Sequence, residues 1–238
     1  EHSRGIIIPI GSAEQHGPTG FIGTDALCPE IIADGVADAT GALVAPTISV
    51  GMAQHHLGFA GSITLRPTTL IAVVVDTIAS LARHGFDRFF FLNGHGGNIA
   101  TVTAAFSEIY AETSLGTARL NRAAVRCRLR NWWHGESVRQ IENEMFGAAN
   151  GSHATAGEVS LTYFGYPEDA KRVQAKGKLS PEIAAEGPIY DCDDYRRRFP
   201  DGRIGSDPTL ATGDIGKRLK DAAVRELSED YKGFLAAD

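Results

Sequence analysis

The chain has 238 residues, of which 43% are hydrophobic and 22% are charged, a composition that supports a substantial core and excludes a disordered chain. Nucleic-acid binders usually carry a basic surface, so the formal net charge of −6 argues against a nucleic-acid partner. The sequence has no apolar run of the roughly 18–20 residues that span a membrane, so we do not expect a membrane partner either. Three cysteines without CxxC spacing and the lack of a recognisable secretory leader predict a cytoplasmic location.

Short apolar runs alternate with longer helical patterns along the chain. Strands are predicted for residues 5–10, 43–50, 88–92 and 123–129. Helices are predicted for residues 25–37, 68–83, 98–113, 138–146, 156–163 and 212–234. This alternation indicates an α/β layered fold with a mainly parallel sheet, in which sites lie in loops at the carboxyl ends of strands. No linker or internal repeat divides residues 1–238, so one domain is expected.

The segment of residues 166–208 is rich in proline, glycine and charge, and we expect a long, partly ordered excursion. It contains the dense basic run of residues 196–198, which lies beside Asp191, Asp193, Asp194 and Asp201. Because acidic residues surround this run, we interpret it as a solvated charged loop.

The first cluster of candidate functional residues follows the strand of residues 5–10. Glu14 and His16 lie two positions apart on a non-helical turn, and Asp25 opens the next helix. Carboxylate oxygens and imidazole nitrogens are ligands for divalent metals. The same residues also fit a polar loop with a helix-capping aspartate, and this cluster by itself leaves both interpretations open.

The second cluster is NGHGGN, residues 93–98, directly after the strand of residues 88–92. Either His95 is a metal ligand at a strand end, or the glycines form an anion cradle whose backbone N–H groups hold a phosphate. The pattern is neither GxGxxG nor a P-loop, and a histidine in the middle of such a cradle is unusual. The ligand interpretation is therefore favoured.

The third cluster contains His153 and Glu158, five positions apart. A transition from loop to helix at His153 would bring both to one site; otherwise they are ordinary residues at a helix start. His56 is a further pocket candidate. Trp132 and Trp133 are either core residues or an aromatic wall. The chain has no GxSxG elbow, so nucleophilic serine catalysis has no support.

Together these strings resemble the creatininase (creatinine amidohydrolase) family. The resembling segments are PIGSAEQHGP at 9–18, GTD at 23–25, NGHGGN at 93–98 and HATAGEVS at 153–160, with weaker matches at 58–65 and 205–212. The resemblance implies a three-layer α/β/α sandwich around a mainly parallel sheet. It also implies a homo-oligomer, often a hexamer, and one or two divalent metal ions per chain (Zn, Mn or Fe).

The resemblance also implies roles for individual residues. Metal ligands would be Glu14, His16, Asp25 and His95, with Asp25 as a bridge between two ions. Glu158 would complete the second position or act on the water, and His153 would bind substrate or transfer a proton. Candidate substrate contacts beside these motifs are His56, Asn93, Gly96 and Trp133.

One departure from the family pattern bears on the substrate. Creatininase has a glutamate two residues after the histidine of NGH, where this chain has Gly97. The sequence therefore predicts a family member other than creatininase itself, a metal-dependent hydrolase of a small cyclic amide or formamide-like C–N substrate. Two alternatives remain: a hydrolase that opens a keto-cyclitol or lactone-like ring, and a non-catalytic module that binds phosphate or a nucleotide.

Overall fold

The computed structural model describes residues 4–116, 124–173, 179 and 187–237. Within these residues four parallel strands form one sheet in the order β2-β1-β3-β4. The strands are β1 (Gly5–Ile10), β2 (Leu43–Val44), β3 (Arg88–Asn93) and β4 (Arg126–Asn131). The helices are α1 (Thr24–Thr40), α2 (Pro67–Ala82), α3 (Asn98–Ser114), α4 (Glu136–Met145), α5 (Ala156–Gly165), α6 (Pro167–Val173), α7 (Cys192–Arg198) and α8 (Gly213–Ala236).

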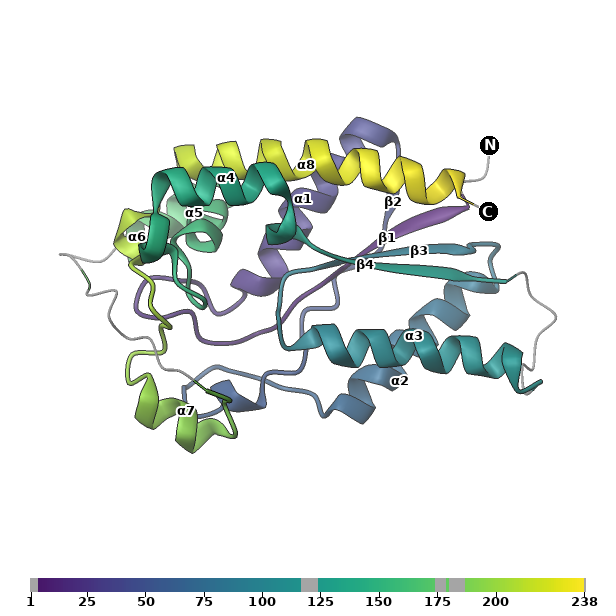
Figure 1. Cartoon of the computed structure of the whole chain (residues 1–238), viewed down its shortest axis with the longest axis horizontal. Coiled ribbons are helices and arrows are strands. Elements are labelled where there is room, and N and C mark those ends of the chain that lie inside the picture. Colours follow the sequence, from purple (N-terminus) through teal and green to yellow (C-terminus); the bar gives the residue numbers. More distant parts are fainter. Residues whose placement is uncertain (1–3, 117–123, 174–178, 180–186, 238) are drawn as a thin grey trace.

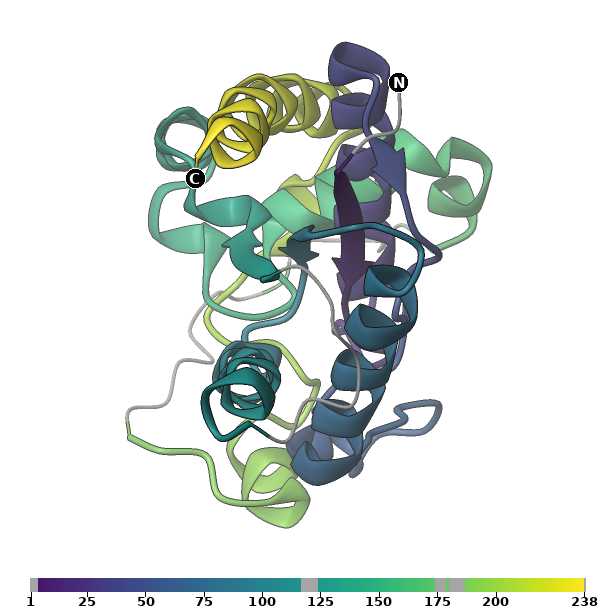
Figure 2. The same cartoon turned by 90° about the vertical axis from the view of Figure 1, so that its right-hand side faces the viewer.

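Helices cover both faces of the sheet (Figure 1), and the view along it separates the two helical layers (Figure 2). Side chains of β1 and β3 alternate between the two faces, as the two-residue period of a strand requires. Ile7 and Phe90 pack with α1 and α8, whereas Ile8 and Phe91 pack with α2 and α3. This arrangement confirms the three-layer α/β/α sandwich. In the described part of the chain, no helix combines the length and the apolarity needed to span a bilayer.

The strand predicted for residues 43–50 is much shorter than expected, because β2 ends at Val44. Pro46 has no N–H group and interrupts the ladder at this edge of the sheet. The chain nevertheless continues along β1, since Ala45 N donates to Ile7 O and Ile48 N donates to Pro9 O. The fourth strand begins at Arg126 instead of residue 123, which lies outside the described residues.

Residues 196–198 are solvent-accessible, as expected, but the prediction of a loop is wrong, because they form the last turn of α7. The side chain of Asp191 caps this helix by accepting hydrogen bonds from the N–H groups of Asp193 and Asp194. Acidic residues in the first turn and arginines in the last turn complement the helix dipole. The predicted excursion also contains α6, while its residues 174–178 and 180–186 lie outside the described part of the chain.

Close packing of α5 against α8 depends on Gly216. A Cβ atom added to Gly216 would lie 1.9 Å from the carbonyl oxygen of Ser160, whereas one added to Gly233 on the same helix meets nothing within 4 Å. We therefore expect Gly216→Ala to lower the free energy of unfolding by about 1–3 kcal/mol through overpacking. Gly233→Ala should raise it by up to about 1 kcal/mol, since alanine favours the helix.

Urea denaturation of both variants checks this expectation. Equal effects of the two substitutions would contradict the assignment of Gly216 to a tight helix contact.

Candidate metal centre

The loops that follow β1 and β3 close on the first turn of α1. A Cβ atom on Gly11 would lie 2.1 Å from the carbonyl oxygen of Asp25, and one on Gly94 would lie 1.9 Å from the same atom. Only glycine allows the two loops to approach this closely. Asp25 is thereby held at the carboxyl ends of two neighbouring strands, between Glu14 and His95.

Glu14, Asp25 and His95 converge on one point. Nδ1 of His95 lies 2.9 Å from Asp25 Oδ2 and 3.4 Å from Glu14 Oε2. One ligand atom from each of the three residues lies within 4.8 Å of the others. Ligands at about 2.0–2.2 Å from a common zinc ion are separated by distances in this range. All three side chains are buried.

The hydrogen bonds of His95 show which nitrogen faces the carboxylates. Nε2 lies 2.9 Å from the carbonyl oxygen of Met52, which can only accept, so Nε2 carries the proton. Gly97 makes this contact possible, since a Cβ atom there would lie 2.4 Å from Nε2. In a neutral ring Nδ1 then presents its lone pair to the carboxylates. A proton donated to a backbone carbonyl is the usual partner of a metal-binding ring nitrogen.

His16 repeats this arrangement on the other side of Asp25. Its Nδ1 donates to Glu14 O at 3.1 Å, and its Nε2 lies 2.9 Å from Asp25 Oδ1 and 3.9 Å from Glu158 Oε1. One ligand atom from each of His16, His153 and Glu158 also lies within 4.8 Å of the others. The structure thus contains a second group of possible ligands, adjacent to the first and joined to it through Asp25.

The carboxylates of this centre have few hydrogen-bond donors. Oε2 of Glu14 and Oδ2 of Asp25 are buried without a hydrogen bond, and Oε1 of Glu14 faces Nε2 of His56 at 2.9 Å. Burying such polar groups without compensation costs several kcal/mol each, roughly 2–7 on transfer scales. A divalent cation between them would remove that cost, so the residues present fit a metal ion.

Without a metal ion, protons on the neighbouring imidazoles compensate part of the buried negative charge. Burial by itself lowers the pKa of His16, but the charge of Asp25 outweighs it and raises the pKa to about 10. Burial also lowers the pKa of His95, and the charges of Glu14 and Asp25 raise it to about 9. Burial raises the pKa of Glu14. Binding of a metal ion would displace the extra ring protons.

His153 and Glu158 occupy the loop-to-helix transition at the start of α5. Thr155 caps the helix in a reciprocal pair with Glu158, in which Thr155 N donates to Glu158 Oε1 at 2.5 Å. Ala154, between the two site residues, has a φ of 51°. This left-handed backbone costs energy for an alanine and turns His153 towards Glu14, where the Nδ1–Oε1 distance is 3.8 Å. Burial raises the pKa of Glu158 to about 7.

Gln15 links the histidines behind the centre, a role that the sequence analysis missed. Its Nε2 donates to Gly202 O at 2.9 Å and to Nδ1 of His56 at 2.9 Å. His56 therefore carries its proton on Nε2, which faces Glu14 Oε1 at 2.9 Å. The backbone oxygen of Gln15 accepts from Nε2 of His153 at 2.8 Å. The hydroxyl group of Tyr195 donates to Gly202 O as well, so this carbonyl accepts from both Tyr195 and Gln15. No local pattern connects Gln15 with Tyr195, because they are 180 positions apart.

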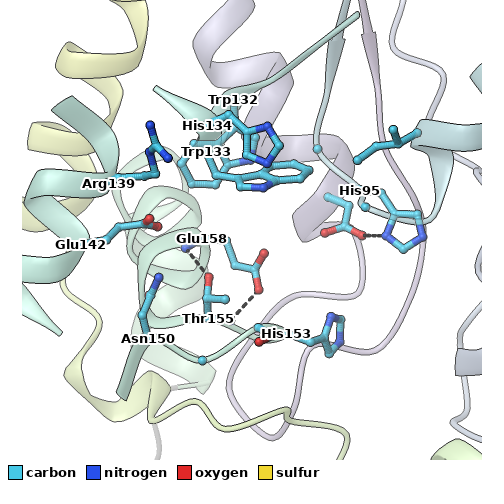
Figure 3. A pocket seen from close by; sticks show the side chains of 16 residues that line it. His95, Trp132, Trp133, His134, Arg139, Glu142, Asn150, His153, Thr155 and Glu158 are labelled. Carbon is cyan, nitrogen blue, oxygen red and sulfur yellow. Dashed lines mark hydrogen bonds and ion pairs between the residues drawn. The ribbon is translucent and has the colours of Figure 1, made fainter. Parts of the chain in front are cut away.

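A cavity of about 530 Å³ opens beside this centre. Its wall includes Asp25, Gly94, His95, Gly96, Ile99, Trp132, Trp133, His134, Arg139, Glu142, Asn150, Gly151, Ser152, His153, Thr155 and Glu158. Figure 3 shows Glu158 between His95 on one side and Arg139 and Glu142 on the other.

Two of the four candidate substrate contacts, Gly96 and Trp133, line this cavity, whereas Asn93 and His56 do not. Asn93 is fully buried and holds the loop of His95, since its Oδ1 accepts from His95 N and its Nδ2 donates to His95 O. His56 Nε2 lies 2.9 Å from Glu14 Oε1, and one ligand atom from each of Glu14, His56 and His153 lies within 4.8 Å of the others. The structure therefore places Asn93 in a supporting position and His56 among the possible metal ligands.

Replacing Gln15 tests the importance of this buried network. Gln15→Met should lower the free energy of unfolding by about 1–3 kcal/mol, because it leaves Gly17 N and His56 Nδ1 without their buried partner. Gln140→Met, at an exposed position on α4, should change it by less than about 0.5 kcal/mol. Urea denaturation of both variants provides the measurement, and a similar loss in both would contradict the network.

Comparisons with known proteins agree with this geometry. The mycofactocin precursor peptide peptidase of Mycolicibacterium smegmatis is 33% identical over 106 residues, which are 42% of this chain and 42% of that protein. The 3-dehydro-scyllo-inosose hydrolase of Thermotoga maritima is 39% identical over 92 residues, which are 38% of this chain and 30% of that protein. The matched segment thus spans less than half the length of each of these curated relatives.

The fold is shared with solved creatininase structures. One described as "Creatininase Mn" superposes with a TM-score of 0.81 at 23% identity, over 98% of this chain and 91% of that chain. The family model described as "Creatinine amidohydrolase" matches residues 1–231. Because this match covers nearly the whole sequence, the chain belongs to the creatininase family.

Proposed function

We propose that this chain is a metal-dependent hydrolase that cleaves the C–N bond of a small cyclic amide or formamide-like substrate. The observation that carries the proposal is that imidazole nitrogens of His16 and His95 face the two oxygens of the buried Asp25 carboxylate, of which Oδ2 has no hydrogen-bond partner. Membership of the creatininase family supports the same reaction class.

Two groups of residues would hold metal ions. Glu14, Asp25 and His95 would hold one divalent cation, and His16 with Asp25 and Glu158 would hold a second. These oxygen and nitrogen ligands suit Zn, Mn or Fe(II), and solved creatininase structures are described with both Mn and Zn-Zn. When bound, such a cation acts as a Lewis acid on a carbonyl group and lowers the pKa of water.

The residues on the cavity wall would position the substrate and transfer protons. If only the first metal position is occupied, Glu158 is the first candidate for proton transfer to the leaving nitrogen, because its carboxyl group is fixed by Thr155 on the cavity wall beside His16. If Glu158 instead holds the second ion, His153 takes this role. His153 donates through Nε2 to the backbone of Gln15, so its Nδ1 is available to accept a hydrogen bond from the substrate. Trp133 offers an aromatic wall for a planar group.

The two alternatives differ in their support. Opening of a keto-cyclitol ring needs the same polarised carbonyl, and the Thermotoga maritima relative is named for such a substrate. A phosphate or nucleotide module has less support, because the N–H groups of His95, Asn98 and Ile99 already donate within their own loop. Carboxylates next to that loop would also repel a phosphate.

Metal content per chain tests the proposal. Elemental analysis of the wild type should find one or two divalent transition-metal ions. Asp25→Asn and His95→Ala should lose most of this metal, and their hydrolysis of an amide panel should fall by more than about 100-fold, since even residues that only support ligands contribute 10–100-fold. A cyclic-ketone panel assayed in parallel separates amide cleavage from ring opening.

Each of the two substitutions has a matched control at an exposed position. Asp34→Asn alters an exposed carboxylate of α1, and His84→Ala removes an exposed histidine after α2. Both should retain metal and activity. A well-folded wild type that takes up no metal on reconstitution, or an Asp25→Asn variant with full metal and full turnover, would overturn the proposed centre.

A further inference from the structure

The cavity has a second polar end, opposite the candidate metal ligands. Arg139 and Glu142 project from α4 into this end, and Asn150 adjoins Glu142 (Figure 3). Trp133, from the segment between β4 and α4, lies on the wall between the two ends. None of these residues contributes to the ligand groups around Asp25. Their chemistry therefore concerns the part of a substrate that does not react.

Arg139 is the one arginine or lysine among the described residues that line the cavity. No described side chain or carbonyl group forms an ion pair or hydrogen bond with its guanidinium. It lies in the first turn of α4, where the helix dipole disfavours a cation. Neither local pairing nor helix electrostatics therefore accounts for its place at the cavity.

Glu142 is spaced to pair with Arg139, three positions away on the same helix, yet it is held elsewhere. Its carboxyl group adjoins the side chain of Asn150. Gly157 N donates to Asn150 Oδ1 at 2.9 Å, which fixes this side chain at the start of α5. The carboxyl group also packs against Gly157, where a Cβ atom would lie 2.3 Å from Glu142 Oε1. Among the described residues no carboxylate pairs with the exposed guanidinium, which is therefore available to an anion in the cavity.

We propose that Arg139 binds a carboxylate group of the substrate, several bonds away from the scissile C–N bond. The planar guanidinium matches the two oxygens of a carboxylate. The neighbouring carboxyl group of Glu142 repels a doubly charged phosphate more than a singly charged carboxylate. This inference rests on the proposed hydrolase function and narrows its substrate class to carboxylate-bearing amides, with the connecting atoms against Trp133.

A paired series of probes tests the proposal on the metal-loaded protein. The probes are N-formyl ω-amino acids of increasing chain length and their primary amides, which differ in the carboxylate alone. Hydrolysis is measured as kcat/KM and binding as Kd by titration calorimetry. At the chain length that reaches Arg139, the wild type should prefer the carboxylate by about tenfold, the lower range for a hydrogen bond to a charged group.

Three variants test whether Arg139 causes the preference for the carboxylate probe over its amide. Arg139→Ala should reduce the ratio of kcat/KM for the carboxylate to that for the amide to about one. Arg139→Lys should retain part of the preference, since lysine keeps the positive charge but lacks the planar pair of N–H donors. Arg83→Ala removes an exposed arginine after α2, on the other face of the sheet, and should leave the ratio as in the wild type.

The outcomes separate this inference from the proposed function. Hydrolysis of both series with no preference at any chain length, or a preference that survives Arg139→Ala, overturns the carboxylate site and leaves the hydrolase intact. Binding of the carboxylates that depends on Arg139, without hydrolysis of either series, supports the carboxylate site and removes the proposed reaction. Failure of the metal-loaded wild type to bind any carboxylate probe also overturns the inference.

Discussion

The structure of the site depends on the burial of two carboxylates, Glu14 and Asp25, with too few hydrogen-bond donors. In a low-dielectric interior such groups are stable only when positive charge lies against them. The neighbouring imidazoles supply positive charge when they are protonated, and a divalent metal ion would supply more. The backbone carbonyls of Glu14 and Met52 fix the orientation of His16 and His95, because each accepts the proton from the nitrogen that faces away from the carboxylates.

The α/β/α architecture supplies the rigidity that this arrangement needs. β1 and β3 are buried on both faces and adjacent in the sheet, so the loops that carry Glu14 and His95 emerge side by side. Glycines at 11 and 94 let both loops contact the first turn of α1. The helices α5 and α8 pack tightly through Gly216, which anchors the N-terminal end of α5 where Glu158 and His153 face the same centre. Strands and helices of both halves of the chain thus converge on one site.

The cavity combines two chemically different ends. One end concentrates carboxylates and imidazoles suited to a divalent metal, and the other presents the guanidinium of Arg139 and the carboxyl group of Glu142. Two relatives are named for unlike substrates, a peptide and an oxidised cyclitol. Residues on the α4 side of the cavity would contact the unreactive part of a substrate. They can therefore distinguish between substrates that share the same reactive group.

The sequence by itself determined the layered fold, the order of most elements and the residue types around the site. Strand-length apolar runs and helical spacing are local signals, and the strings around Glu14, His95 and His153 carry their chemistry within a few residues. Only the tertiary structure decided which ring nitrogen of each histidine faces inward, that Asn93 holds the loop of His95, and that no described residue pairs with Arg139. Those properties arise from contacts between distant segments, such as Gln15 with Gly202 and His95 with Met52, and no local pattern encodes them. The edge strand beyond Val44 and the helix at residues 192–198 were mispredicted for local reasons instead, since Pro46 interrupts the strand and Asp191 caps the helix.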